Sequence, residues 1–220
     1  MIGSSAPVDL KICVACGARA QTPVVPATEP VVVCADCGHR QPFRRLPLFA
    51  LTGPSGTGKS TVGRLLTAEL GDRVVVLEQD VLWTAGLRDP ADDHRLFRST
   101  WLRMAAMVHQ SGRPVVLCGT VVPVQFAQCP EHVFFSDIHY FGLVCDSQVL
   151  RERLRARPAW REWDEPRIAE MVEFNEWVRR SAADMDPPVE LLDTTTLPLA
   201  DTVRAVADWV RRGLADASLH

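Results

Sequence analysis

One stretch of this chain has the residue types and the spacing of a phosphate-binding loop. Residues 53–60 read Gly-Pro-Ser-Gly-Thr-Gly-Lys-Ser and match the pattern G-x-x-x-x-G-K-[ST] at every fixed position. Glycines let the backbone wrap around an anion with its N–H groups turned inward. Lys59 would place its charge on the β- and γ-phosphates of a nucleotide, and the Ser60 hydroxyl can ligate Mg²⁺. The residues expected to hold the nucleotide are Gly53, Ser55, Gly56, Thr57, Gly58, Lys59, Ser60 and Thr61.

The residues around this loop supply the strand and the helix that it needs. The apolar run 48–51 precedes it as a short buried strand. Behind the loop, apolar residues recur at helical spacing until Gly71 ends the helix, namely Val62, Leu65, Leu66 and Leu70. The chain has only two lysines, Lys11 and Lys59. A lysine kept in the loop fits its role, because a planar guanidinium does not replace a point charge wrapped by backbone. This context argues against a chance glycine-rich turn.

Four of the seven cysteines have the spacing of a metal site. Cys13 and Cys16 form one C-x-x-C pair, Cys34 and Cys37 form the other, and a glycine follows each pair. Four thiolates at this spacing suit tetrahedral Zn²⁺. A redox dithiol would need only one pair beside a βαβ pattern, and a catalytic zinc would keep one ligand position open. We therefore expect residues 1–45 to form a zinc ribbon with a structural Zn²⁺.

Composition and charge narrow the function classes. The chain of 220 residues is 47% hydrophobic and 23% charged, which is typical of a globular protein. Its net charge of −3 gives no support for a globally basic nucleic-acid binder. No apolar run has the length of a membrane span and no leader pattern opens the chain, so we expect a cytoplasmic protein without a membrane partner. The other three cysteines, Cys118, Cys129 and Cys145, are scattered, and the reducing compartment argues against disulfides. Cys118 and Cys145 lie in apolar runs and are interpreted as small buried hydrophobes. The oligomeric state stays open.

From residue 46 onward, short apolar runs alternate with helical segments. After the strand at 48–51, the expected strands are residues 73–77, 115–118, 139–144 and 189–192. After the helix that follows the loop, the expected helices are residues 94–110, 149–157, 165–180 and 199–214. This alternation predicts an α/β domain, residues 46–220, in which helices cover both faces of a parallel five-stranded sheet. Ligands gather at the carboxyl ends of the strands in such sheets.

With this loop and this order of elements, residues 46–214 resemble the small P-loop kinases, the P-loop NTPase group that includes adenylate, shikimate and gluconate kinases. The resemblance implies an ATP-dependent phosphotransferase that uses Mg²⁺. It also implies that Asp80, just past the second strand, contacts the acceptor hydroxyl as its base or orienting group. A helix N-cap or a surface loop is the alternative for this aspartate. Glu78 and Asp72 are weaker acidic candidates.

Residues 150–157 resemble the Leu-x-x-Arg-Leu-x-x-Arg helix with which this group leads into a mobile lid. By that resemblance, Arg153 and Arg157 would clamp phosphate oxygens and stabilise the transferred charge, with Arg161 as a further candidate. A solvated arginine face paired with nearby glutamates is the alternative. We favour that alternative for Arg151 and Arg155.

The third strand departs from the pattern of the motor-type ATPases. It ends Leu-Cys-Gly, without an acidic residue at its tip. Motor-type ATPases need a carboxylate there for Mg²⁺ and for activating water, so that class is disfavoured. The acceptor site of the small kinases usually lies between the second and third strands. Here that segment holds Trp83, Arg88, Asp92, Asp93, His94, Arg98 and Arg103, which do not identify an acceptor.

The sequence therefore favours a kinase that moves the γ-phosphate of ATP to a small-molecule acceptor of the hydroxyl or nucleoside/nucleotide type. Its expected catalytic residues are Lys59, Asp80, Arg153 and Arg157. The alternative from another class is a nucleotide-binding regulator or adaptor whose zinc ribbon contacts nucleic acid or protein. A third possibility is a kinase that acts on the end of a polynucleotide. The choice between ATP and GTP is open.

Overall fold

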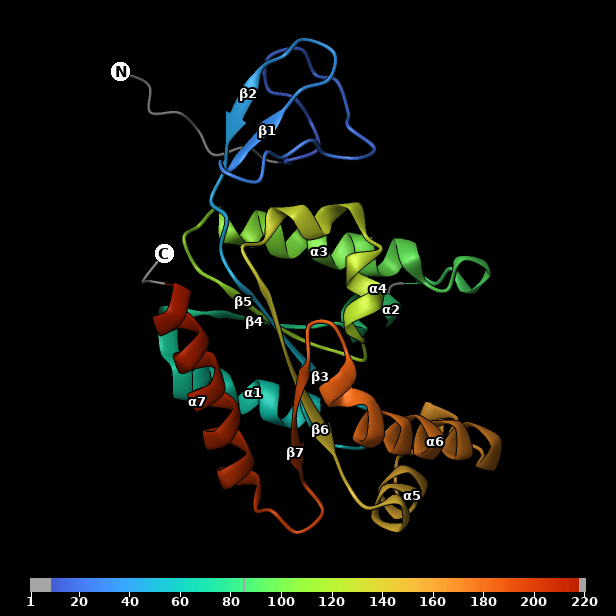
Figure 1. Cartoon of the computed structure of the whole chain (residues 1–220). Helices are drawn as coiled ribbons and strands as arrows, with labels where there is room; N and C mark the ends of the chain where they lie inside the picture. The colour runs from blue at the N-terminus through green and yellow to red at the C-terminus, as the bar shows by residue number, and fades with distance from the viewer. Residues whose placement is uncertain (1–8, 85, 218–220) are drawn as a thin grey trace.

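The computed structural model describes residues 9–84 and 86–217. Its centre is a parallel sheet with the strand order β4-β5-β3-β6-β7 (Figure 1). The strands are β3 (Leu48–Thr52), β4 (Val75–Glu78), β5 (Val115–Cys118), β6 (Ile138–Val144) and β7 (Val189–Asp193). β3, the strand that leads into the phosphate-binding loop, lies in the middle of the sheet, between β5 and β6. The predicted α/β fold with five parallel strands is confirmed.

Helices cover both faces of the sheet. Helices α1 (Lys59–Leu70) and α7 (Leu199–Ala217) pack on one face, and α3 (Arg95–His109) with the short α4 (Pro123–Ala127) on the other (Figure 1). Successive side chains of β3 point to opposite faces, so Phe49 and Leu51 join the first layer while Leu48 and Ala50 join the second. All five residues of β3 are buried, as expected for a central parallel strand.

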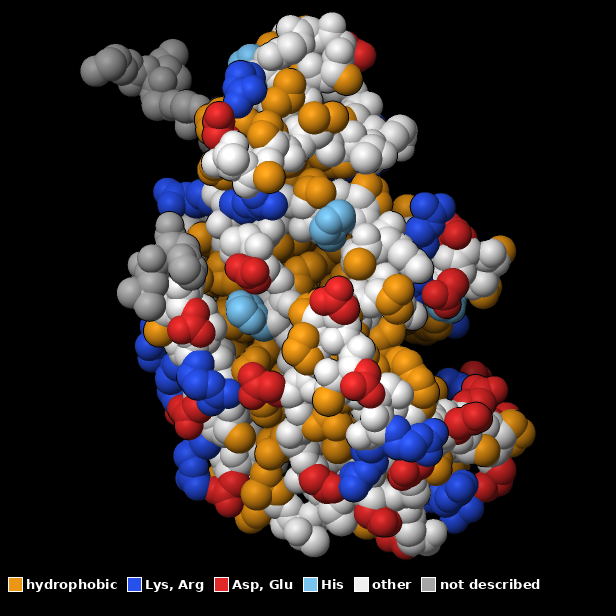
Figure 2. Space-filling model, in the orientation of Figure 1, with side chains coloured by type: hydrophobic (Ala, Val, Ile, Leu, Met, Phe, Trp, Pro, Cys, Tyr) orange, Lys and Arg blue, Asp and Glu red, His pale blue; other side chains and the backbone are white. Residues whose placement is uncertain are grey.

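Two further helices stand beyond the carboxyl ends of β6 and β7. Helices α5 (Ser147–Arg155) and α6 (Glu165–Ser181) pack on each other around a small apolar cluster of their own. Asp146 caps α5, and its carboxylate accepts from the backbone N–H groups of residues 148 and 149. Asp164 caps α6 in the same way. These two helices form one side of a hollow in the surface (Figure 2).

Several short elements have no periodic signal in the sequence and were not expected. They are α2 (Asp80–Thr84), α4, and the 3₁₀ turns η1 (Gly71–Arg73), η2 (Pro90–Asp92), η3 (Pro130–Phe134), η4 (Ala159–Arg161) and η5 (Ala182–Asp184). One expected core position is wrong, because Leu65 is exposed. For Leu65 the reason is Gly63, which faces the sheet so closely that a Cβ there would lie 2.8 Å from Cys118 Sγ. That approach turns α1 so that Leu65 points to solvent.

The N-terminal segment forms a small antiparallel unit. Strands β1 (Val31–Val33) and β2 (Arg40–Pro42) pair in it, next to α3 and η3 (Figure 1). Its Leu10, Val32 and Phe43 belong to the same buried cluster as the α3 side chains. The division at residues 45 and 46 stays a prediction, and residues 1–8 and 218–220 of the two expected domains lie outside the described residues. Within the described ranges, no helix combines the length and the apolar character that crossing a membrane requires.

Candidate nucleotide and acceptor site

The phosphate-binding loop is closely packed where β3 meets α1. Gly53, Gly56 and Gly58 have φ values of 126°, 96° and 101°, which L side chains rarely adopt. Space excludes side chains as well, since a Cβ at Gly53 would lie 2.2 Å from the carbonyl oxygen of Leu143. The glycines of the motif are therefore required by both backbone conformation and packing. The loop that they form wraps around the amine of Lys59.

Lys59 is buried with its amine inside this loop. Its Nζ donates to the carbonyl oxygens of Gly53 at 2.6 Å and Pro54 at 2.9 Å. Burial lowers the pKa of Lys59 to about 8, while the negative charges of Asp80 and Glu78 act to raise it. The amine is thus close to both acidic groups that follow β4.

Glu78 lies beside Ser60, the last residue of the motif. Its carboxylate hydrogen-bonds to the Ser60 side chain, and burial raises the pKa of Glu78. The register pairs Glu78 with Cys118, the last residue of β5. Burial also raises the pKa of the Cys118 thiol, so β5 offers a neutral group at its tip. The tip of β5 has no carboxylate, but Glu78 at the end of the neighbouring strand β4 has one. The oxygen atoms of Ser60 and Glu78 are of the kind that Mg²⁺ prefers as ligands.

Sequence reasoning placed Glu78 among the weaker candidates. The signal that would have raised it is its place at the carboxyl end of β4, two residues before Asp80 on the same edge of the sheet. Asp72, the other weak candidate, lies in η1, which follows the far end of α1 from the loop. The structure does not bring Asp72 into the site.

Asp80 is the first residue of α2, and its carboxylate is largely exposed. Its Oδ2 lies 3.8 Å from Nη1 of Arg161, which belongs to η4 between α5 and α6. The ion pair thus reaches from the β4 side of the site to the α5–α6 side. Figure 2 shows the surface hollowed at its right edge, between the lobe that carries α2 and the lobe that carries α5 and α6.

The two arginines expected in the lid have different partners. Arg157 is half-buried, and its pKa is lowered by that burial and by the charge of Arg161, while Asp80 acts to raise it. Its charge also acts on Lys59. Arg153 instead donates to Thr194, to the carbonyl oxygen at 2.8 Å and to Oγ1 at 3.2 Å. Arg157 and Arg161 are therefore the arginines that share an electrostatic environment with Lys59 and Asp80.

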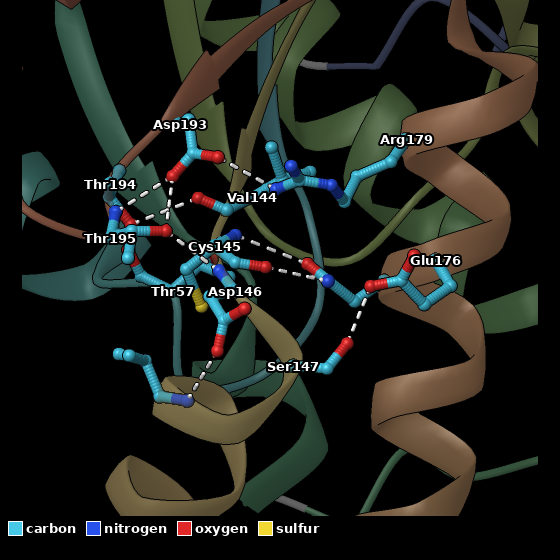
Figure 3. A network of polar contacts seen from close by, with 12 residues as sticks. Thr57, Val144, Cys145, Asp146, Ser147, Glu176, Arg179, Asp193, Thr194 and Thr195 are labelled. Carbon is cyan, nitrogen blue, oxygen red and sulfur yellow. Dashed lines mark hydrogen bonds and ion pairs between the residues drawn. The ribbon is translucent and has the colours of Figure 1, made fainter.

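The loop after β7 is tied to the phosphate-binding loop by a polar network (Figure 3). Thr194 donates from its backbone N–H to the carbonyl oxygen of Val144 at 2.7 Å, and its Oγ1 approaches the Thr57 carbonyl oxygen at 3.5 Å. Asp193 accepts from Arg179 on α6 and from the backbone N–H of Thr195. Residues 193–195 therefore connect β7, the phosphate-binding loop and α6 in one network.

Two polar groups are buried in the segment that runs from the end of β4 to the start of β5. The side-chain amide of Gln79 packs closely on Gly119: a Cβ added to Gly119 would lie 1.5 Å from Gln79 Oε1. The backbone carbonyl oxygen of Gln79 accepts from Trp101 Nε1 at 3.1 Å. Arg98 on α3 is only 5% exposed, and its Nη2 donates to Asp93 at 3.0 Å. No feature of the sequence indicated the buried position of Gln79.

A second cluster with possible ligands lies in the N-terminal unit. Sulfur atoms of Cys13, Cys16, Cys34 and Cys37 all lie within 4.8 Å of one another. The Cys13–Cys37 and Cys16–Cys34 sulfur pairs are each 3.7 Å apart, and all four are free cysteines. A tetrahedron with Zn–S bonds of about 2.3 Å has edges of about 3.8 Å. Two of the sulfur–sulfur distances are close to this edge and all lie within 4.8 Å, so the four sulfurs could surround one metal ion.

Comparisons with known proteins agree with this fold. Over 76 residues, 33% of this chain, the sequence is 42% identical to a shikimate kinase of Chlorobaculum tepidum. The match spans 40% of that protein's length. The structure is similar to that of a gluconokinase from Sinorhizobium meliloti, with a TM-score of 0.50 and 23% identity over 80% of this chain and 96% of the other. It is also similar to a shikimate kinase from Acinetobacter baumannii in complex with shikimate, with a TM-score of 0.53 and 18% identity over 77% and 96%.

These structural likenesses show the fold, which is that of the P-loop kinases. A family model described as "AAA domain" matches residues 50–176, from β3 into α6. The matched stretch includes the phosphate-binding loop, the acidic end of β4 and the arginines of α5. Because it makes up more than half of the sequence, the chain belongs to the AAA domain family.

Proposed function

We propose that this protein is an ATP-dependent phosphotransferase that moves the γ-phosphate to a hydroxyl group of a small molecule. The observation that carries this proposal is the gathering of opposite charges around one hollow. Lys59, Glu78 and Asp80 lie on the side of the sheet, and Arg157 and Arg161 face them from the α5–α6 side. Basic groups suit a triphosphate, and an exposed carboxylate suits the acceptor hydroxyl.

The chain's own residues account for each requirement of the reaction. Lys59 would bind the β- and γ-phosphates, which would replace the loop carbonyls as partners of its amine. Ser60 and Glu78 would hold Mg²⁺ directly or through water, and a bound Mg²⁺ would neutralise charge on the phosphates. Asp80 would accept the proton of the acceptor hydroxyl as its oxygen bonds to the γ-phosphorus. The bond from that phosphorus to the bridging oxygen breaks, and ADP leaves with the electron pair. Arg157 would stabilise the charge on the transferred group.

Arg98 supports an acceptor that carries a negative charge. It is a buried cation on the acceptor side, and its carboxylate partner Asp93 is mostly exposed. Among the described residues, Arg98 Nε has no hydrogen-bond partner. A buried guanidinium is stabilised by an anion in a fixed position. We therefore favour a hydroxylated carboxylic acid or phosphate ester, and shikimate, on which the curated relative acts by its name, is the first such compound to test.

The test is transfer of label from γ-labelled ATP to pools of possible acceptors. Hydroxylated acids including shikimate, neutral sugars, nucleosides with nucleotides, and oligonucleotides form four pools. We expect label in the acid pool and none with Lys59→Ala, because that variant loses the charge that binds the phosphates. Nucleotide binding without transfer to any pool would instead favour the regulator or adaptor. Equal activity of Lys59→Ala and wild type would show that the site is elsewhere.

We further propose that the four cysteines bind one Zn²⁺. Support comes from the short distances between their sulfurs and from the backbone N–H groups of residues 15, 16, 18 and 39, which donate to the sulfurs. Such N–H groups stabilise thiolates in a metal site. The strands of this unit have three residues each, too few to be stable alone. Elemental analysis of the purified chain should give one zinc per molecule, and none for the variant in which all four cysteines are serine.

A further inference from the structure

The zinc ribbon, here the described residues 9–45, is joined to the rest of the chain by a buried ion pair. Lys11 Nζ donates to Glu131 Oε1 at 2.8 Å, and the two side chains are 9% and 0% exposed. The other carboxylate oxygen of Glu131 accepts from Ser99 Oγ at 2.6 Å. One buried carboxylate therefore links three elements: the ribbon, η3 and α3. Removing one partner of such a pair leaves an uncompensated buried charge, which is strongly unfavourable.

Lys11 is held in place by the first cysteine pair. Its carbonyl oxygen accepts from the N–H of Ala20 at 2.8 Å, and Cys13 N–H donates to Ala18 at 2.9 Å, so residues 11–20 form a small hairpin. Cys13 and Cys16 lie in this hairpin. A metal that fixes the two sulfurs therefore fixes the hairpin, and with it the position of Lys11. Lys11 is also the only lysine of the chain besides Lys59.

Further contacts of the ribbon go to the same helix and turn. Arg103 on α3 forms an ion pair with Asp9. Gln110, which follows α3, accepts from the backbone N–H of Arg44 at 2.8 Å. Phe43 packs edge to face on Phe134 of η3, with ring centres 5.7 Å apart. The ribbon thus contacts α3 in its middle and just past its end, and it reaches Ser99 near the start of α3 through Glu131.

Helix α3 also contacts the segment that follows β4. Ser99, which meets Glu131, lies between Arg98 and Trp101 in the sequence. Trp101 donates to the backbone carbonyl of Gln79, the residue between Glu78 and Asp80. A shift of α3 would therefore move both the buried guanidinium and the chain that carries the two acidic groups. The phosphate-binding loop packs instead against β6 and α5.

We propose that zinc in the four-cysteine site orders the acceptor side of the hollow through the contacts of Lys11, Glu131 and Ser99. The metal-free protein should keep its phosphate-binding loop and lose order in α3 and η3. This inference rests on the proposed function in one respect: that the region ordered by zinc binds the acceptor. The coupling between ribbon and α3 is measurable without any acceptor, so failure to find a substrate would leave it intact.

The test is amide hydrogen exchange of the zinc-loaded full chain before and after chelation. We expect exchange to rise about tenfold or more in residues 95–109 and 130–134 after zinc removal, because local opening is no longer opposed by the ribbon. Exchange in α5 and α6 should rise much less, because the described residues of the ribbon contact α3 and η3 rather than these helices. The affinity for a non-hydrolysable ATP analogue without Mg²⁺, which depends on the phosphate-binding loop and not on Glu78, should change by less than about twofold by calorimetry. A rise confined to residues 9–45 would overturn the proposal.

Variants separate the ion pair from the metal. Lys11→Met should raise exchange in α3 while zinc content stays at one per chain. Arg40→Met is the matched control, because Arg40 is a ribbon cation in an exposed pair with Glu29 and should leave α3 unchanged. Should Lys11→Met fail to fold, Ser99→Ala is decisive, since it cuts only the link from Glu131 to α3. Unchanged exchange of α3 in a folded Lys11→Met or in Ser99→Ala would overturn the proposal.

Discussion

The amine of Lys59 is buried, and burial disfavours its charged form. Burial lowers its pKa to about 8, and Asp80 and Glu78 hold the value from falling further. The amine is mostly protonated at neutral pH and loses its proton as pH rises through about 8. Only the protonated amine attracts phosphate oxygens. The charge of this one residue therefore sets an upper pH limit for nucleotide binding.

Nucleotide affinity should consequently fall as pH rises above about 8. The loss should approach tenfold for each pH unit above the pKa, because each unit reduces the protonated fraction of Lys59 tenfold. Calorimetry with Mg²⁺ and a non-hydrolysable ATP analogue, from about pH 7.5 to about pH 9.5, measures this slope. Lys59→Arg keeps its charge throughout and should bind more weakly with a flat profile. A flat wild-type profile would contradict this role of Lys59.

Glu78 should matter for magnesium. Glu78→Gln removes the negative charge beside Ser60 while keeping the size of the side chain. We expect the Mg²⁺ concentration for half-maximal nucleotide binding to rise about 10- to 100-fold, the usual effect of losing a supporting group at a metal site. Glu69→Gln on the surface of α1 is the control and should stay within about twofold. Equal magnesium requirements of the two variants would place the metal elsewhere.

The sequence showed which residues belong to the site better than it showed which groups those residues contact. Lys59 and Ser60 were readable, because the motif fixes backbone and side chains together. Arg153 and Arg157 could not be separated, since four-residue spacing would put both on one face of the expected helix without showing what that face meets. In the structure α5 ends at Arg155, so Arg153 lies in the helix and meets Thr194, while Arg157 lies beyond it and shares the environment of Lys59. A phosphate-binding role for Arg153 stays a prediction.

At the scale of elements, long buried segments were predictable and short ones were not. Strand β5 was expected at its observed bounds, because four consecutive buried apolar residues leave little choice. α2 and the 3₁₀ turns are held by tertiary contacts, such as Trp83 of α2 packing on Phe97 of α3. Such contacts have no periodic pattern. The orientation of α1 likewise depends on the close approach of Gly63 to β5, which apolar spacing alone does not show.

Arg157, in the turn between α5 and α6, should affect transfer of the phosphoryl group more than binding of the nucleotide. Arg157→Met should lower turnover by about 100- to 1000-fold, because it removes a fixed positive group from the transferring charge. Arg155→Met is a matched control, since Arg155 is the last residue of α5 and pairs with Glu165 at the surface. It should retain turnover within about twofold. Single-turnover kinetics with an accepted substrate distinguish the two, and similar losses in both variants would point to a general effect on α5.

For the molecule as a whole, the ribbon and the sheet share one buried cluster. Leu10, Val32 and Phe43 from the ribbon pack in the same cluster as Phe97 and Phe134. A unit with two three-residue strands could not form such a core alone. The cysteine spacing indicated a separate small domain, but spacing does not show what a domain packs against. The structure makes the ribbon a part of the layer that covers one face of the sheet.

Metal removal should therefore destabilise the whole chain in one transition. With free zinc at about 1,000 times its Kd, binding to the native state alone stabilises it by about 4 kcal/mol. For a chain of this size that corresponds to a fall of roughly 10 °C in Tm on chelation. Calorimetric scans of the zinc-loaded chain, the chelated chain and Cys34→Ser measure the effect, and Cys145→Ser controls for loss of a buried thiol outside the cluster. The contrary result would be a separate unfolding transition of the ribbon at low temperature, with the main transition unchanged. It would show that the shared cluster does not couple the ribbon to the sheet, because residues of one common core lose their packing together.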